Sequence, residues 1–206
     1  MTEASGDREA GEAVSYTGLS VGAFLDALAA GTPAPAGGSA AALVLAQAAA
    51  LCSKAARLSA SQLTADLAAE LTTEAEHIRG AAASLIDEDS RAYQAVIEQS
   101  RRLRGSRTDE SHAGGRASGL AAALSAAADV PIRIVELATS VASLAAVLAR
   151  DGKPALRGDA IAAGLLARAA ARAAAALVSI NLADMPADPR HVRADSLLAA
   201  IDELVR

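Results

Sequence analysis

The stretch TPAPAGGSAAALVLAQAAAL, residues 32–51, sets the pattern for this chain of 206 residues. Its two prolines cannot lie inside a helix, because proline lacks an N–H group and clashes with the preceding turn. Two glycines then allow the backbone to approach another group closely or to take a positive φ. Alanine is the best helix former, so a helix is expected to follow directly, over residues 39–58. The stretch therefore predicts a rigid loop that leads into an apolar helix.

Two interpretations of this loop are open. In the structural one, the loop is a linker and Ser39 caps the helix, because serine oxygens accept hydrogen bonds from first-turn N–H groups. In the functional one, N–H groups without a partner at the helix N-terminus bind an anion or a carbonyl group. The loop residues alone do not decide between the two.

The rest of the chain reads as helices joined by short breaks. Apolar residues recur at helical spacing, and no segment alternates with the period of two that is typical of strands. Helices are expected at residues 21–30, 39–58, 64–103, 116–128, 131–150, 160–182 and 192–205, with Ser20 and Asp159 as caps of the first and sixth. The fold class is therefore all-α, a mainly antiparallel bundle of about five to seven helices. Residues 1–18 are expected to form a flexible tail, and residues 19–206 a single helical domain.

Composition narrows the class of protein. A net charge of −5 with scattered basic residues argues against nucleic-acid binding. The one cysteine, Cys52, cannot form an intramolecular disulfide and is expected to fill the core. The longest apolar run, residues 40–51, is too short to cross a bilayer, and the acidic N-terminus does not resemble a secretion signal. We therefore expect a cytoplasmic protein that binds neither nucleic acid nor membrane.

One carboxylate is expected to point into the core. The apolar stripe of the helix over residues 64–103, continued by threes and fours from Leu85, reaches Asp89, whereas Asp87 and Glu88 are expected to face solvent. A buried carboxylate is costly unless it is paired or hydrogen-bonded. Asp89 is thus either a functional side chain or a structural partner for a buried arginine or backbone group.

Metal chemistry has weak support in the sequence. Glu74 and His77 match half of the Glu-x-x-His signature of di-iron bundles, which needs a second such motif and two further glutamates. His112 and His191 lie in expected loops and do not complete it. No metal is therefore expected.

Several segments together resemble the cyclodeaminase/cyclohydrolase family. This family contains the cyclodeaminase half of formiminotransferase-cyclodeaminase and the bacterial methenyltetrahydrofolate cyclohydrolases, and its usual loop reads TPxPGGGS. The matching segments are FLDALA (24–29), TPAPAGGSAAA (32–42), IDEDSRAY (86–93), VP (130–131), GD (158–159) and INL (180–182). The chain departs from the family pattern at Ala36, Lys153, Gly158 and Leu177, where glycine, asparagine, serine and asparagine are usual. A positive φ at position 36 would cost alanine steric strain.

The resemblance implies a homodimer that acts on a one-carbon unit carried by tetrahydrofolate, as a cyclohydrolase or a cyclodeaminase. It implies Asp89 as the catalytic carboxylate and Asp159 as a second candidate. Substrate contacts are expected from Pro35, Gly37, Gly38, Ser39 and Asn181, and from Lys54 and Arg57 to the folate glutamate tail unless these two are solvated surface charges. The alternative is a catalytically degenerate family member that serves as a dimeric small-molecule-binding or protein-interaction module.

Overall fold

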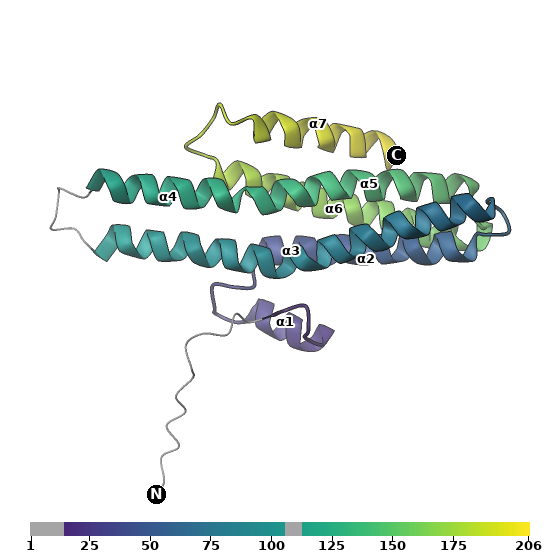
Figure 1. Cartoon of the computed structure of the whole chain (residues 1–206), viewed down its shortest axis with the longest axis horizontal. Coiled ribbons are helices and arrows are strands. Elements are labelled where there is room, and N and C mark those ends of the chain that lie inside the picture. The colour runs from purple at the N-terminus through teal and green to yellow at the C-terminus, as the bar shows by residue number, and fades with distance from the viewer. Residues whose placement is uncertain (1–14, 106–112) are drawn as a thin grey trace, which may run out of the picture.

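A computed structural model describes residues 15–105 and 113–206, and over these residues the chain is all-α, as predicted (Figure 1). The elements are α1 (Val21–Ala29), α2 (Gly37–Leu58), α3 (Ala65–Gly105), α4 (Ala113–Ala127), α5 (Asp129–Asp151), the 3₁₀ turn η2 (Pro154–Leu156), α6 (Arg157–Asn181) and α7 (Pro189–Leu204). The expected helices are therefore all present, with ends shifted by a few residues.

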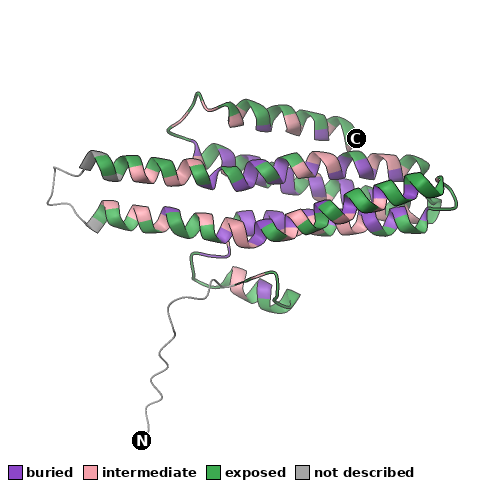
Figure 2. Cartoon of the chain, viewed as in Figure 1, coloured by how far each residue is buried: buried purple, intermediate pink, exposed green. Residues whose placement is uncertain are grey.

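The core lies where α2, α5, α6 and the first half of α3 pack against one another (Figure 2). Alanine supplies much of the contact, because its small side chain lets helix axes approach closely. On α6 the fully or almost fully buried positions include Ala163, Ala167, Ala171 and Ala174. Leu45, Ile78 and Ile134 are fully buried and add the larger side chains. Cys52 is also fully buried, in agreement with its expected place in the core, and burial raises its pKa to about 12.

Unequal helix lengths create a ledge in the bundle. Helix α3 has 41 residues and α2 has 22, so α3 runs well beyond the N-terminus of α2. Its outer half pairs with α4, and this hairpin projects past the C-terminal end of α6 (Figure 1). The loop of residues 32–36, the start of α2 and the end of α6 therefore meet the side of a longer hairpin.

Helix α1 lies beside the bundle, and the residues before it are held on α3. The Tyr16 N–H donates to Asp87 Oδ1 at 2.7 Å, and the hydroxyls of Thr17 and Ser15 donate to Asp87 Oδ2 at 2.8 and 2.9 Å. Burial alone would raise the pKa of Asp87, but these hydrogen bonds lower it below its usual range. Asp87 was expected to face solvent, but it is half-buried and hydrogen-bonded to residues 15–17. Residues 1–14 of the expected tail lie outside the described residues.

Of the two helix caps predicted at Ser20 and Asp159, the structure confirms the first and contradicts the second. Ser20 caps α1, its side chain accepting from the Ala23 N–H at 3.2 Å, as predicted. Asp159 does not cap α6, because the turn η2 leads directly into a helix that begins at Arg157 after the N-cap residue Leu156. Asp159 instead lies in the first turn of α6. Pro131 stands near the start of α5, as its missing N–H group allows.

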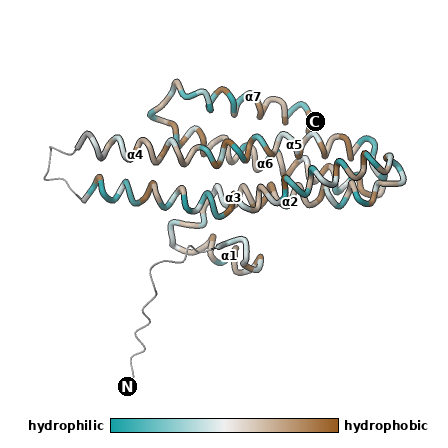
Figure 3. Tube along the Cα trace, viewed as in Figure 1, coloured by the Kyte–Doolittle hydropathy of each residue, from teal (hydrophilic) through white to brown (hydrophobic). Residues whose placement is uncertain are grey.

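The apolar helices are longer than the uninterrupted apolar run suggests. By length and composition alone, three segments could cross a membrane: Gly37–Leu58, Ala117–Asp151 and Pro154–Asn181. These helices extend beyond the unbroken apolar run of residues 40–51, and the expectation that the chain does not bind membrane stays a prediction. In the structure these segments bury 61%, 50% and 44% of their most apolar windows within the bundle. Figure 3 shows the mixed hydropathy of the outer part of α3 and of α7.

Candidate functional site

The ledge contains a cavity of about 240 Å³ built from four helices. Its lining residues are Ala36, Gly37 and Gly38 at the start of α2, Asp89, Ala92 and Tyr93 on α3, Ala127 at the end of α4, and Leu177, Ile180 and Asn181 near the end of α6. Asp89 is the only ionised side chain expected among them at neutral pH. The predicted loop and the predicted core-facing carboxylate thus meet at one site.

Asp89 reaches across from α3 to the first turn of α2. Its Oδ2 accepts from the Ser39 N–H at 2.8 Å and lies 3.1 Å from the Ser39 hydroxyl. Burial raises the pKa of Asp89, and the two contacts with Ser39 lower it, with a net rise above the usual range. Ser39 is therefore not the cap of α2, as the structural interpretation supposed. The N-cap is Ala36, which offers no side-chain bond, and Asp89 supplies an acceptor from another helix.

Gly38 is required where the carboxylate meets the helix. A Cβ placed on Gly38 would lie 1.9 Å from Asp89 Oδ1, whereas a Cβ on Gly37 would meet nothing within 4 Å. Ala36 has an extended backbone with φ −135°, so alanine there costs no strain, contrary to the concern raised by the sequence. Among the described residues no glycine has a positive φ. The glycine at position 38 serves close approach and not an unusual turn.

Hydrogen bonds to the Ala34 carbonyl hold the loop that precedes α2. The Tyr16 hydroxyl and the Thr32 hydroxyl each donate to the Ala34 carbonyl at 3.1 Å. Pro35, which follows a cis peptide bond, is buried and does not line the cavity. Pro35 thus lies on the buried side of the loop, and its expected contact with substrate stays a prediction.

Side chains of α3 and α6 form the far wall. The Asn181 amide donates to the Ala127 carbonyl at 3.0 Å, which directs its side-chain oxygen away from that carbonyl. Tyr93, one helical turn after Asp89, is 42% exposed and lines the same cavity. The sequence analysis named Tyr93 only within the segment of residues 86–93 and not as a site residue, although its i+4 spacing from Asp89 was a usable signal. The cavity therefore combines one carboxylate, one amide, one aromatic ring and the backbone of a helix N-terminus.

Comparisons with known proteins identify the family of this chain. The family model for formiminotransferase-cyclodeaminase matches residues 20–196. The chain belongs to the formiminotransferase-cyclodeaminase family. Within it, the chain is 34% identical over 163 residues to a methenyltetrahydrofolate cyclohydrolase of Methylorubrum extorquens, covering 77% of this chain and 76% of that protein.

A solved structure shares the fold. The formiminotetrahydrofolate cyclodeaminase of Thermotoga maritima superposes with a TM-score of 0.74, at 22% identity, over 91% of this chain and 90% of that one. At this identity the likeness supports the bundle and not a shared activity.

Two of the four departures from the family pattern lie at the cavity. Ala36 and Leu177 line it, and Leu177 stands one turn before Asn181 on α6. Lys153 and Gly158 lie at the opposite end of α6, where the Lys153 N–H donates to the buried Ser59 hydroxyl at 2.8 Å. The four substitutions therefore act at two separate places in the fold.

The other charged candidates also lie far from the cavity within one chain. Asp159 is 18 residues before Leu177 on α6, about 27 Å along the helix axis. Its carboxylate pairs with Lys54 at 2.7 Å, and Arg57 lies 3.3 Å from Glu76. The structure thus brings together Asp89, Gly37, Gly38, Ser39 and Asn181, and it separates Asp159, Lys54 and Arg57 from them.

A metal centre has no support in the described residues. Among them, no group of three or more histidine, cysteine, aspartate or glutamate side chains is placed to hold an ion. His77 is exposed on α3, and His112 lies outside the described residues. The absence of metal stays a prediction for the chain as a whole.

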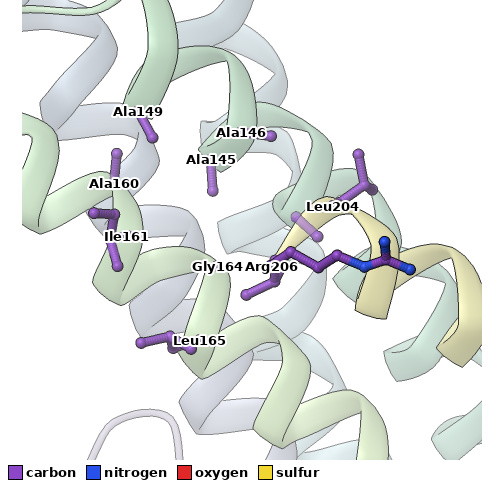
Figure 4. Close-up of a pocket in the computed structure, with 11 residues that line it drawn as sticks. Ala145, Ala146, Ala149, Ala160, Ile161, Gly164, Leu165, Leu204 and Arg206 are labelled. Carbon is purple, nitrogen blue, oxygen red and sulfur yellow. The ribbon is translucent and has the colours of Figure 1, made fainter.

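A second cavity, of about 190 Å³, lies between α5, α6 and the C-terminal end of the chain (Figure 4). Five of its eleven lining residues are alanine, and Ile161, Leu165 and Leu204 are among the larger apolar ones. Its one charged side chain, Arg206, pairs with Glu203. No histidine, aspartate or glutamate side chain lines this cavity, whereas the ledge holds Asp89, so the ledge is the candidate site.

Proposed function

We propose that this chain is a folate-dependent one-carbon enzyme that hydrolyses methenyltetrahydrofolate to formyltetrahydrofolate. The observation that carries the proposal is a single partly buried carboxylate, Asp89, with a raised pKa in a ledge cavity. The family and the cyclohydrolase relative support this reaction. The alternative reaction on a folate one-carbon unit is deamination of formiminotetrahydrofolate, the activity in the name of the structural neighbour.

The chemistry of the substrate suits this carboxylate. The methenyl carbon belongs to a delocalised cation that spans two nitrogens, and a negative carboxylate beside it lowers the energy of the bound cation. Water adds to that carbon and loses a proton, which Asp89 accepts as general base. One carbon–nitrogen bond then breaks as its nitrogen takes up a proton and the new hydroxyl loses one, which leaves a formyl group. A pKa raised by burial makes Asp89 a better proton acceptor than an ordinary aspartate.

The other walls offer recognition of the ring system. The N–H groups of Gly37 and Gly38 lie at the start of α2, where no partner in their own helix exists, and can donate to the pterin carbonyl. The side-chain oxygen of Asn181 can accept from a ring N–H group. The N–H of Ser39 is already used by Asp89, so Ser39 is better assigned to Asp89 than to the substrate.

The decisive experiment mixes the purified protein with methenyltetrahydrofolate and follows the loss of its near-ultraviolet absorbance. We expect acceleration over buffer, and loss of most of it in Asp89→Asn with an unchanged helical circular dichroism spectrum. Glu88→Gln is the matched control, because Glu88 is next to Asp89 but pairs with Arg133 outside the cavity. No acceleration in the wild type, together with no binding by calorimetry, contradicts the folate function.

A catalytically degenerate, ligand-binding protein is the second candidate. The apolar Leu177 in the cavity wall favours it, because the family usually has an asparagine there. Calorimetry that detects folate binding without turnover would support this candidate. In that case Leu177→Asn should raise turnover if the lost amide is the cause, whereas the nearby Ile180→Val serves as a control for altered packing.

We further propose a homodimer in the cytoplasm that binds neither nucleic acid nor membrane. Large apolar side chains exposed on α6 support the dimer: Ile161, Leu165 and Ile180 are 46%, 51% and 65% exposed. Light scattering should give twice the chain mass at micromolar concentration, and a monomer contradicts the dimer. Co-flotation of the protein with anionic vesicles would contradict the absence of membrane binding.

A further inference from the structure

We propose that Ser39 is a positioning residue that holds Asp89 by Oδ2 alone and thereby presents Oδ1 to the bound ligand. The consequence for catalysis rests on the proposed hydrolysis. The geometry itself can be tested without any turnover. This role differs from the direct substrate contact that the sequence suggested for Ser39.

The two carboxylate oxygens of Asp89 have unequal surroundings. Oδ2 lies within hydrogen-bond distance of both the N–H and the hydroxyl of Ser39, at 2.8 and 3.1 Å. Oδ1 has no hydrogen-bond partner among the described residues. It is not among the buried atoms that lack a partner, so it is accessible from the cavity. It stands where a side chain on Gly38 would be. One oxygen is therefore anchored, and the other is free to contact a cation or a water molecule.

Ser39 is itself held firmly. It is fully buried, and its hydroxyl lies 2.9 Å from the Ile86 carbonyl and 3.0 Å from the hydroxyl of Ser90, which is 2% exposed. With Asp89 ionised, Ser90 can donate to Ser39 and Ser39 to Asp89. With Asp89 protonated, the Ser39 hydroxyl can rotate and donate to the Ile86 carbonyl. The same hydroxyl thus complements both states of Asp89 with no movement of heavy atoms.

Few other groups influence this carboxylate. The cavity walls from α2, α4 and α6 carry no ionisable side chain, and on α3 the ionisable neighbour in the wall is Tyr93. The adjacent acidic residues face elsewhere: Asp87 contacts Tyr16, and Glu88 pairs with Arg133. Since hydrogen bonds to the ionised form favour it, loss of the Ser39 hydroxyl should raise the pKa of Asp89 further.

The test is a carbon-13 NMR titration of the Asp89 carboxyl in wild type, Ser39→Ala and Ser90→Ala. The midpoint should move to higher pH by about one unit in Ser39→Ala, which is the expected size for one hydrogen bond to a charged group. It should move by much less in Ser90→Ala, which removes a hydroxyl from the same buried cluster without touching Asp89. An unchanged midpoint in Ser39→Ala overturns the inference.

Kinetics provide the second measurement. The acid limb of kcat/KM should move in Ser39→Ala by the same shift as the NMR midpoint, with activity retained at high pH. A uniform loss at every pH, with a fixed NMR midpoint, would indicate a merely structural serine and overturns the inference. If the wild type lacks turnover, the proposed function fails while the NMR result still decides. If Ser39→Ala loses its helical circular dichroism, Ser39→Cys replaces it in the NMR titration, because a thiol is a weaker donor than a hydroxyl. A midpoint in Ser39→Cys equal to that of the wild type again overturns the positioning role of Ser39.

Discussion

Gly38→Ala should disrupt the site more than any other single methyl group added to the start of α2. The added Cβ would lie 1.9 Å from Asp89 Oδ1, 2.4 Å from its Cγ and 2.8 Å from Oδ2. Ordinary contact begins at 3.4 Å, so Oδ1 must retreat by 3.4 − 1.9, about 1.5 Å. A shift of this size in a short side chain breaks the 2.8 Å bond from the Ser39 N–H. The buried carboxylate then lacks its anchor.

The free energy of unfolding should fall accordingly. Overpacking and the lost charged hydrogen bond cost about 1 to 3 kcal/mol, whereas the helix gains at most about 1 kcal/mol when alanine replaces glycine. Gly37→Ala is the matched control, because its Cβ meets nothing within 4 Å and its backbone is also helical. We therefore expect Gly38→Ala to be less stable than Gly37→Ala by about 2 kcal/mol, or about 4 to 8 °C in Tm.

Urea denaturation and thermal melting of the two variants measure this difference. Turnover gives an independent measurement, because displacement of Asp89 should remove most activity in Gly38→Ala at every substrate concentration. In Gly37→Ala an effect on KM alone is expected. Equal stability and equal kcat in the two variants would refute the close approach of Gly38 and Asp89 on which the site rests.

Three further variants test the charges. Asp89→Asn should be more stable than wild type near pH 7, because the pKa of Asp89 is raised in the folded protein. The stability of the wild type should fall as pH rises from the ordinary aspartate pKa of about 3.9 through the folded pKa. In urea denaturation the gain in stability of Asp89→Asn over wild type should therefore shrink in acid. Asp87→Asn should lose stability near neutral pH, because the lowered folded pKa of Asp87 stabilises the wild type above the ordinary aspartate pKa, and this stability is lost as pH falls. Hydrogen exchange at the Tyr16 amide should also become faster in Asp87→Asn. Asp159→Ala should cost no more than about 1 kcal/mol in urea denaturation, because its pair with Lys54 is exposed. A larger loss for Asp159→Ala, or a less stable Asp89→Asn at pH 7, would contradict these assignments.

The sequence predicts the bundle well because the signals for it are local. Apolar periodicity and the breaks at proline and glycine mark the helices, and residues 130–131 show where a new helix begins. The core-facing position of Asp89 follows from the same periodicity. Its partner does not, because the contact between Asp89 and Ser39 joins residues 50 apart in the chain and depends on how two helices are staggered.

The same limit explains why the sequence grouped side chains that the fold separates. Lys54 and Arg57 share a helix with Gly38, and residue type alone suggests that they bind the folate tail. A helix carries residues apart at about 1.5 Å per residue, so Arg57 lies about 28 Å along α2 from Gly38. Helix α6 runs from Asp159 to Asn181 and separates its two candidates in the same way. Membership of one motif therefore did not imply membership of one cavity.

The loop that leads into α2 owes its importance to what α3 places against it. Its sequence fits a plain helix start, and one hydrogen bond that a cap would normally supply is missing at Ala36. The fold supplies an acceptor from Asp89, which stabilises the N-terminus of α2 and holds a carboxylate in a site where burial raises its pKa. With Asp89 in place of Ser39 as the acceptor at the helix start, a structural role and a functional role of the loop are compatible. The contact that completes the helix is the one that directs Oδ1 into the cavity, and a glycine at position 38 is the condition for both.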